Sequence, residues 1–380
     1  AQSFKDFQII ARANNFETYA LPSPSYLNNI TPQINDFGDV SFHVISYFDE
    51  NPTHSLFFKS FIETNGKLVY SAPNQRYISD PSMSGDGRIV FNQFDDGKND
   101  GVFLYNSKVN KTRNVISPKL FGLESFSRAK INSFNDIVFR ARDEFGDRLL
   151  IVKKYNEAPY VLARHGNSID DNLVSYLFEP SLKSQFLVTK VRYGESRRWG
   201  ETRPDSLIKW NLITGEKEKV VDSDYNKSSI FKSFHNSVAV SRFGTMAFVN
   251  KDGANKKTIY LQDDNSVRKL VEDGDGDIAE IENFSVAINS YDEVAFRAIK
   301  KNGRRAIFYV KNGKLKELIS EGDFLPTDQE TARIIIKKGF PGFSGGININ
   351  DNEQITFHCL IESKNGERVM GSAIYIADME

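Results

Sequence analysis

Short apolar stretches alternate with polar turns along the whole chain and predict β-strands. The apolar runs are five to eight residues long and are flanked by Gly, Asn or Asp, which is typical of strands rather than helices. In the clearest example two of the turns contain Asn-Gly, which favours a hairpin because both residues tolerate positive φ. This example predicts four strands, at residues 293–298, 306–310, 315–320 and 332–337. Four short strands joined by tight turns form a propeller blade.

A nine-residue pattern recurs seven times and gives the chain a period. The first copy, residues 34–42, reads Ile-Asn-Asp-Phe-Gly-Asp-Val-Ser-Phe. The copies begin near residues 34, 83, 131, 180, 240, 288 and 349, and the fourth copy is degenerate. Their closing positions lie 49, 48, 49, 60, 48 and 61 residues apart. A repeat period near fifty residues predicts one all-β domain over residues 1–380, a seven-bladed β-propeller.

Two positions of the pattern have predicted structural roles. The fifth position is Gly, Asn or Asp in five copies, and these residues enter the left-handed region at the lowest cost. Ser184 and Glu353 depart from this rule, so we expect those two turns to differ. The closing position is aromatic except at Val188, and we expect it to form a wedge between neighbouring blades.

The N-terminal segment is expected to close the ring. The last copy is followed by a strand at residues 373–376, and its blade then lacks a third strand. Residues 8–14 resemble the third strand of another repeat, residues 160–166. We therefore expect residues 1–33, chiefly 5–28, to complete the seventh blade. Such a closure removes two exposed sheet edges that would otherwise promote aggregation.

The repeats resemble a known group of bacterial sequences. Residues 289–297 and the Glu-Gly-Asp turn at 321–323 are similar to the tandem NxxGxxAF repeats of exported bacterial proteins, and the likeness covers nearly the whole chain. This resemblance implies an exported, propeller-like protein, often tethered at the cell surface, with no agreed activity. The chain starts Ala1-Gln2-Ser3, as a trimmed signal peptide or an artificial boundary would leave it. We expect a secreted or periplasmic location.

Composition narrows the classes of partner. Hydrophobic residues make up 39% of the chain, with 30 Phe and 15 Tyr, so a large core is expected. The net charge of −1 argues against nucleic acid. No apolar run approaches the roughly 20 residues that span a bilayer. Cys359 is the only cysteine, which excludes an internal disulfide and favours an inert core position. We expect a monomer.

The first candidate site is a ring of residues that follow the closing positions. If their strands line the central channel, these side chains share one level, and together they are polar and lean cationic. Such a ring suits a carboxylate, a phosphate or an acidic sugar. The alternative is structural, with each Arg paired to a carboxylate of the next blade. The ligand-binding candidates are His43, Asn92, Arg140, Lys190, Arg297 and His358.

The second candidate is an insertion in the fourth repeat, residues 192–204. Loops rich in Trp and Arg have the composition of a recognition hot spot, and a Trp face stacks on sugars and cations. The alternative is a loop folded over its blade, with the Trp filling a groove. The candidate residues are Arg197, Arg198, Trp199 and Arg203.

Two further segments were considered for ligands or metals. The linker at residues 323–346 is rich in Gly and Phe, and it is either a ligand-binding loop or a spacer. The turn at residues 273–277 alternates Asp and Gly, but it lacks the Gly and Glu that an EF-hand loop requires. The five histidines show no zinc-ligand spacing. We predict no metal site and no cofactor.

The sequence favours recognition over catalysis. It contains no Gly-x-Ser-x-Gly elbow, no phosphate-binding loop and no Asp-box of the sialidase type. The leading hypothesis is a propeller that binds a glycan, a peptide or an envelope protein, at the channel mouth or through the loop around Trp199. The alternatives are an enzyme acting on an anionic polysaccharide from a central site, and a scaffold for protein assembly. A propeller fold alone does not choose among them.

Overall fold

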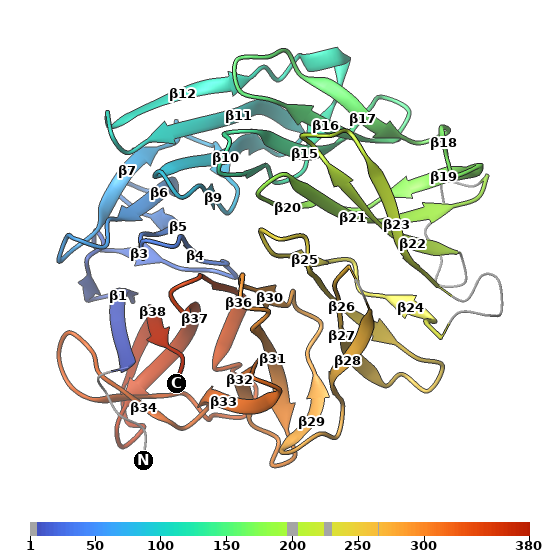
Figure 1. Ribbon diagram of the computed structural model, residues 1–380. Helices are drawn as coiled ribbons and strands as arrows, with labels where there is room; N and C mark the ends of the chain where they lie inside the picture. Colours follow the sequence, from blue (N-terminus) through green and yellow to red (C-terminus); the bar gives the residue numbers. More distant parts are fainter. Residues whose placement is uncertain (1–5, 196–203, 224–229, 265) are drawn as a thin grey trace.

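Seven antiparallel sheets form a closed ring in the computed structural model of the protein (Figure 1). The structure describes residues 6–195, 204–223, 230–264 and 266–380. This architecture confirms the predicted seven-bladed all-β propeller. A 3-10 turn, η2 (Leu120–Gly122), lies in the connection between blades 2 and 3. Among the described residues, no helix has the length and apolar character needed to cross a membrane.

Each blade has four antiparallel positions, and its innermost strand is split into two short pieces. In blade 1 both pieces pair with the same side of one strand: Ser25 pairs with Ser46, whereas Gln33 pairs with Ser41. Blade 1 consists of β3 (Ser25–Tyr26), β4 (Gln33–Ile34), β5 (Val40–Ser46), β6 (Thr53–Lys59) and β7 (Lys67–Ser71). The strand that carries the closing aromatic is therefore the second strand of its blade, counted from the channel.

Blades 2 to 6 repeat this arrangement. Blade 2 consists of β8 (Tyr77–Ile78), β9 (Ser82–Met83), β10 (Arg88–Asp95), β11 (Lys98–Asn106) and β12 (Lys111–Ile116). Blade 3 consists of β13 (Ser125–Phe126), β14 (Lys130–Ile131), β15 (Ile137–Arg142), β16 (Arg148–Lys153) and β17 (Tyr160–Arg164). Blade 4 consists of β18 (Ser168–Ile169), β19 (Asn172–Leu177), β20 (Ser181–Lys183), β21 (Phe186–Tyr193), β22 (Asp205–Asn211) and β23 (Lys217–Asp222). Blade 5 consists of β24 (Ser233–Phe234), β25 (Ala239–Val240), β26 (Met246–Lys251), β27 (Lys257–Gln262) and β28 (Val267–Glu272). Blade 6 consists of β29 (Ile278–Ile281), β30 (Ala287–Ile288), β31 (Val294–Lys300), β32 (Arg305–Lys311) and β33 (Lys314–Ser320).

Blade 7 joins the two ends of the chain. It consists of β34 (Phe324–Leu325), β35 (Ala332–Ile334), β36 (Phe343–Ile349), β37 (Gln354–Ser363), β38 (Val369–Asp378), β1 (Phe7–Ala13) and β2 (Thr18–Tyr19). The assignment of residues 332–337 to the preceding blade was wrong, because β35 pairs with β37 rather than with any strand of blade 6.

The N-terminal strand seals the ring, as predicted. β1 pairs with β38 from Phe7 opposite Ala377 to Ala13 opposite Ser372. The buried Arg12 side chain holds Asp328 through two bonds of 2.9 Å and also donates to the carbonyl of Met370 at 3.0 Å. The predicted closing segment was too long, because residues 25–34 form the innermost strand of blade 1.

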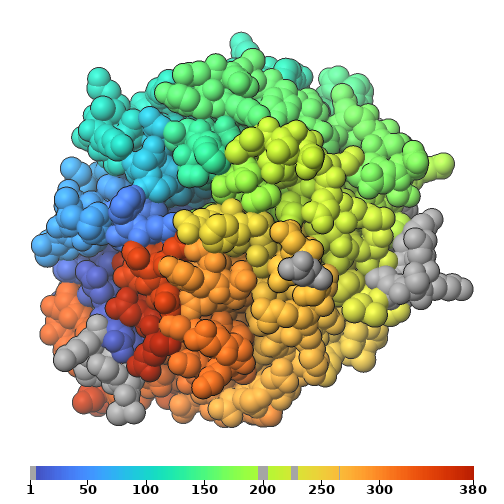
Figure 2. All heavy atoms as spheres, viewed as in Figure 1, coloured from blue at the N-terminus to red at the C-terminus, as the bar shows by residue number. Residues whose placement is uncertain are grey.

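Seven apolar clusters lie between consecutive blades, and the closing aromatics are part of them. Phe139, for example, packs with Val90 and Val102 of the preceding blade. Figure 2 shows that side chains fill most of the space between adjacent blades. The aromatics in these clusters are Phe42, Phe91, Phe139, Phe248, Phe296 and Phe357. They confirm the predicted wedges and contribute to the apolar burial that holds the blades together.

Blade 4 departs from the pattern by one residue. In the other blades, the residue that pairs with the innermost strand immediately precedes the aromatic: in blade 3, Val138 pairs with Lys130 and precedes Phe139. In blade 4 the corresponding residue is Val188, which pairs with Ser181. Thr189 therefore occupies the wedge position, and Val188 belongs to the cluster shared with blade 5. Val188 thus packs between neighbouring blades as predicted, but it faces blade 5 whereas the aromatics face the preceding blade, because β20 and β21 are joined by a tight two-residue turn, Ser184 and Gln185.

The fifth position of every copy adopts positive φ, between 49° and 91°. Glu353, with a φ of 57°, follows the other copies despite its residue type, so its backbone conformation does not differ as expected. Ser184 also has positive φ, at 49°, but its turn is the shortened one. The turn geometry therefore determines the backbone conformation, and Gly, Asn and Asp reach it at the lowest cost.

The Asn at the second position of the pattern joins neighbouring blades. The Asn132 Oδ1 accepts from the backbone N–H groups of Phe134 and Asp136 at 3.0 and 2.8 Å. Its Nδ2 donates to the Asp136 carboxylate at 3.0 Å and to the carbonyl of Ser184 in the next blade at 2.8 Å. The same bond to the next blade is made by Asn35, Asn289 and Asn350. The conserved spacing of the pattern thus has a structural cause.

A candidate binding site in the central channel

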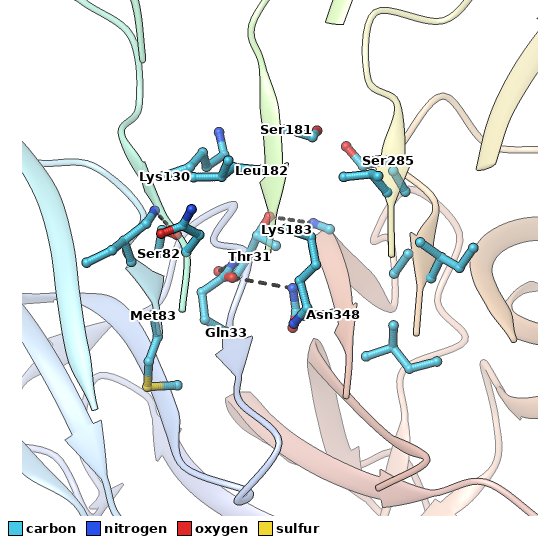
Figure 3. Close-up of a pocket in the computed structure, with 18 of the residues that line it drawn as sticks. Thr31, Gln33, Ser82, Met83, Lys130, Ser181, Leu182, Lys183, Ser285 and Asn348 are labelled. Atoms are coloured by element: carbon cyan, nitrogen blue, oxygen red, sulfur yellow. Dashed lines mark hydrogen bonds between the residues drawn. The ribbon is translucent and has the colours of Figure 1, made fainter. Parts of the chain in front are cut away.

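The split innermost strands surround a cavity of about 380 Å³ that residues from all seven blades line. At its middle level, one residue from each blade occupies an equivalent position in the strand register. We call this set the channel ring: Gln33, Ser82, Lys130, Ser181, Ala239, Ala287 and Asn348. Figure 3 shows Ser82 and Lys130 on one side of the cavity and Ser285 on the other.

The channel ring is chemically one-sided. Five of its members, from blades 7, 1, 2, 3 and 4, are polar, whereas blades 5 and 6 contribute Ala239 and Ala287. Asn348 Nδ2 donates to Gln33 Oε1 at 3.3 Å, and the Ser82 hydroxyl accepts from the Ile131 N–H at 3.1 Å. The polar arc is thus preorganised by hydrogen bonds, while the alanine arc leaves room beside it.

Two ion pairs border the polar arc. Arg128 Nη1 lies 3.2 Å from Asp80 Oδ2, and Lys130 Nζ lies 3.6 Å from Glu179 Oε1. Asp80 also accepts from the Thr31 N–H at 3.3 Å. The two pairs connect blades 2, 3 and 4, and Asp36, Lys183 and Arg242 add further charged groups to the cavity lining.

Burial shifts the pKa values of these groups. It lowers the pKa of Lys130 to about 8, with a contribution from the nearby Arg128, because a buried ammonium loses hydration. Burial alone would raise the pKa of Glu179, but Lys130, Arg128 and Arg140 together lower it. Burial raises the pKa of Asp80 despite the attraction of Arg128. Lys130 therefore changes charge near neutral pH beside a carboxylate that stays ionised.

The residues predicted to ring the channel do not line its cavity. Their strands are the second strands of the blades, and four of the six side chains bond the split innermost strand of the next blade. Asn92 Nδ2 donates to the Ser127 carbonyl at 2.7 Å, and Arg297 Nη1 donates to the Gly345 carbonyl. Arg140 bonds the Leu177 carbonyl, and Lys190 bonds the Phe234 carbonyl. Asn92 and the three cations therefore hold neighbouring blades together, and the assumption that their strands line the channel was wrong.

The two predicted histidines also lie away from the cavity. The His43 Nε2 lies 2.7 Å from His54 Nδ1, and the two rings stack. Burial, with a smaller effect of His54, lowers the pKa of His43 to about 3. His358 is buried, and neither ring nitrogen has a hydrogen-bond partner among the described residues. Burial, assisted by Arg297, lowers the pKa of His358 to about 4. Both rings are therefore neutral at pH 7.

The remaining predicted sites have different outcomes. Arg197, Arg198, Trp199 and Arg203 lie outside the described residues. In the Asp-Gly turn, the Asp273 carboxylate accepts from the N–H groups of Lys257 and Ile281 at 2.9 and 2.7 Å. That carboxylate therefore organises backbone. Among the described residues, no group of three or more His, Cys, Asp or Glu side chains has the arrangement of a metal site.

Sequence reasoning missed Arg128, Lys130 and Glu179. Lys130 lies in a strand of two residues, and Arg128 and Glu179 lie in the connections beside such short strands, so they carry no periodic signal. The residue immediately before the first position of each copy would have revealed most of the channel ring, since Gln33, Lys130 and Asn348 all stand there. Reading the register backwards from the closing aromatic finds the same positions.

Comparison with known proteins supports the fold and does not reach function. No known protein family and no curated protein matches the chain in sequence. The propeller domain of the trilobed protease from Pyrococcus furiosus is similar in structure, with a TM-score of 0.62, 11% identity and 94% of each chain covered. An acylaminoacyl peptidase from Pyrococcus horikoshii has a TM-score of 0.61 and 14% identity, over 93% of this chain and 51% of that protein. An oligogalacturonate lyase in complex with manganese has a TM-score of 0.57 and 10% identity, over 98% of this chain and 96% of that protein. The Pyrococcus furiosus domain has an open velcro topology, whereas β1 and β38 close the ring here.

Proposed function

We propose that the protein is an exported recognition propeller whose channel binds a hydroxyl-rich ligand carrying one anionic group, such as the acidic end of a glycan. The observation that carries this proposal is the one-sided channel ring, in which Lys130 is the single charged member among amides and hydroxyls. Pockets for small ligands combine a few convergent polar groups with an apolar wall.

The chemistry of the arc matches such a ligand. Lys130 and the adjacent Arg128 offer cations to a carboxylate, while Ser82, Ser181 and Gln33 offer hydrogen bonds to hydroxyl groups. The wall formed by Ala239 and Ala287 suits the apolar face of a sugar ring. Because Glu179 and Asp80 offset the two cations, the site favours one anionic group over a dense polyanion.

Calorimetric titration of a neutral oligosaccharide that ends in one galacturonate unit, with its methyl ester as the neutral counterpart, tests the proposal. Lys130→Met should weaken binding of the acid about tenfold or more, because one charge-assisted hydrogen bond is lost. Lys217→Met, which alters an exposed residue of β23, is the matched control and should leave the affinity unchanged. Equal affinity of Lys130→Met and the unmodified protein for the acid would remove the channel from the proposal.

A catalytic alternative rests on one observation, the Lys130 amine with a pKa of about 8 beside Glu179. An amine in that range suits general base catalysis, including removal of the proton next to a uronate carboxyl group. Incubation with short oligogalacturonates then decides between binding and turnover. Appearance of an unsaturated product, followed by its ultraviolet absorbance and lost in Lys130→Met, would favour the enzyme.

A further inference from the structure

A second cavity, of about 490 Å³, lies where blades 6 and 7 meet. Its walls are the turn between β31 and β32 and the segment between β35 and β36, which includes much of the linker at residues 323–346. We call it the blade 6–7 groove. Its lining residues are Asn302, Gly303, Arg304, Arg305, Glu321, Ile336, Lys337, Lys338, Gly339, Phe340 and Pro341. It shares no lining residue with the channel.

The buried carboxylate of Glu321 connects the two walls of the groove. Its Oε1 accepts from the Arg305 N–H at 2.6 Å, and its Oε2 accepts from the Gly342 N–H at 2.7 Å. One side chain therefore ties the hairpin of blade 6 to the linker of blade 7. Because both oxygens are engaged with backbone donors, Glu321 is held in place as a structural acceptor.

Four cations line the groove against this single carboxylate. Arg305 is already paired with Glu282 at 3.1 Å. The exposed side chains of Arg304, Lys337 and Lys338 have no ion-pair partner in the described part of the chain. Like charges gathered on two adjoining loops repel one another unless an anion lies between them. This groove therefore presents an unbalanced positive potential.

The backbone brings Arg304 into the groove wall. Gly322 has a φ of 90°, and a side chain there would meet the Arg304 guanidinium and Ile336 at 3.0 Å. Glycine at this turn thus leaves the space that the guanidinium occupies. Asp323 is near enough to act on Arg304 electrostatically, but its carboxylate accepts from the Ser320 N–H at 2.9 Å.

An aromatic platform stands beside the cations. The Phe340 ring is 50% exposed, and Lys337 Nζ lies 5.3 Å from its centre. Ile336 and Pro341 extend the apolar wall, and Asn302 supplies an amide. An exposed ring next to cations and an amide matches a sugar that has an apolar face, hydroxyl groups and an acidic substituent.

We infer that the blade 6–7 groove is a second binding site, for the negatively charged units of an acidic glycan. Carboxylate or sulfate groups of the glycan bind Arg304 and Lys338, and a sugar face rests on Phe340. Repeated acidic groups along one chain suit this groove, because its cations outnumber its carboxylates, whereas the balanced charges of the channel suit a single group.

Binding to immobilised glycans, in the full chain carrying Lys130→Met, isolates this site from the channel. The probes are hexagalacturonate for carboxylates, dextran sulfate for sulfates and neutral dextran as the uncharged counterpart. Arg304→Ala/Lys338→Ala should weaken binding of at least one acidic probe about tenfold or more, and added salt should reduce what binding remains. Phe340→Ala should weaken the same probe several-fold without changing its salt dependence.

The matched control is Lys111→Ala/Arg113→Ala, which removes the same two charges beside a smaller cavity of blades 2 and 3. If both double variants lose affinity equally, the binding reflects general positive charge and the inference is overturned. Retention of glycan affinity by the Arg304/Lys338 variant also overturns it, as does binding of a phosphopeptide in place of either acidic glycan. Circular dichroism melts of each variant confirm that the fold is intact. If Lys130→Met leaves the affinity of the channel ligand unchanged while Arg304→Ala/Lys338→Ala weakens acidic glycan binding as expected, the channel proposal alone is rejected.

Discussion

Two neighbouring positions of the repeat behave in opposite ways. The second position is Asn in four of the seven copies, and those Asn side chains form the same bond to the next blade. In six of the seven copies the channel-ring residue stands two residues earlier, and the ring contains Gln, Ser, Lys, Ala and Asn. The repeated Asn residues hold neighbouring blades together, whereas the channel-ring residues, which differ from blade to blade, form the candidate binding surface. In a repeat protein, the positions that differ between repeats are therefore the candidates for ligand binding.

The largest expected effect comes from removing the closing strand. Deletion of residues 1–19 leaves the edge of β38 unpaired and Asp328 without Arg12. We expect the melting temperature to fall severely, because an exposed edge and an uncompensated carboxylate both destabilise the fold. Differential scanning calorimetry measures the change. A deletion variant that melts like the full chain would show that the ring holds without its closure.

The substitution Asn132→Ala tests the contribution of the Asn at the second position of the pattern to stability. Four hydrogen bonds of the buried amide are lost, so we expect a decrease of about 2 kcal/mol in the free energy of unfolding. Urea denaturation gives the value. Ser241→Ala serves as the control, because among the described residues that hydroxyl accepts only from its own turn, at 3.2 and 3.3 Å, and its loss should have a smaller effect. Equal effects would mean that the bond to the next blade contributes nothing.

Acid should weaken the interface between blades through buried histidine. The pKa of His358 is lowered in the folded protein to about 4, so the unfolded chain binds the proton first as the pH falls from 6.5 towards 4. Stability therefore decreases in that window, by about 1–2 kcal/mol from this residue between pH 7 and 5. Urea denaturation at both pH values should show a smaller decrease for His358→Leu. Identical decreases would assign the acid sensitivity to other groups.

The smallest expected effect is on ligand affinity and concerns Lys130 of the channel ring. Lys130, with a pKa of about 8, is mostly charged at pH 7 and mostly neutral at pH 9. Affinity for the oligosaccharide that ends in one galacturonate unit should therefore fall about tenfold across this range, while Lys130→Met should show a flat profile. An unchanged affinity of the unmodified protein at pH 9 would show that the charge of Lys130 takes no part in binding.

The sequence predicted the blade number and the wedges because both depend on large, regularly spaced residues. Phe42, Phe139 and Phe296 produce a periodic signal that survives along the whole chain. The innermost strands gave no comparable signal, since pieces such as β14 hold two residues and pair only through backbone. Without those strands, the second strand was taken as the wall of the channel, and Arg140 and Arg297 were assigned to the wrong surface.

The shift in blade 4 had a similar origin. A turn of two residues replaces the longer turn of the other copies, and side-chain alternation then moves the wedge from Val188 to Thr189. The spacing of the pattern put Val188 at the closing position, whereas Thr189 stands there in the structure and its hydroxyl donates to the Phe178 carbonyl at 2.8 Å. A polar residue with a local partner is as well buried as an apolar one.

The pairing of Phe7 with Ala377 has a consequence for biosynthesis. A ribosome that adds about 5–20 residues per second needs roughly 20–70 s to travel from one strand to the other. During that interval β1 has been made and its partner does not yet exist. The nascent polypeptide must therefore keep an apolar strand unpaired until translation is almost finished, and a chaperone that shields this segment would be engaged from the first seconds of synthesis to the last.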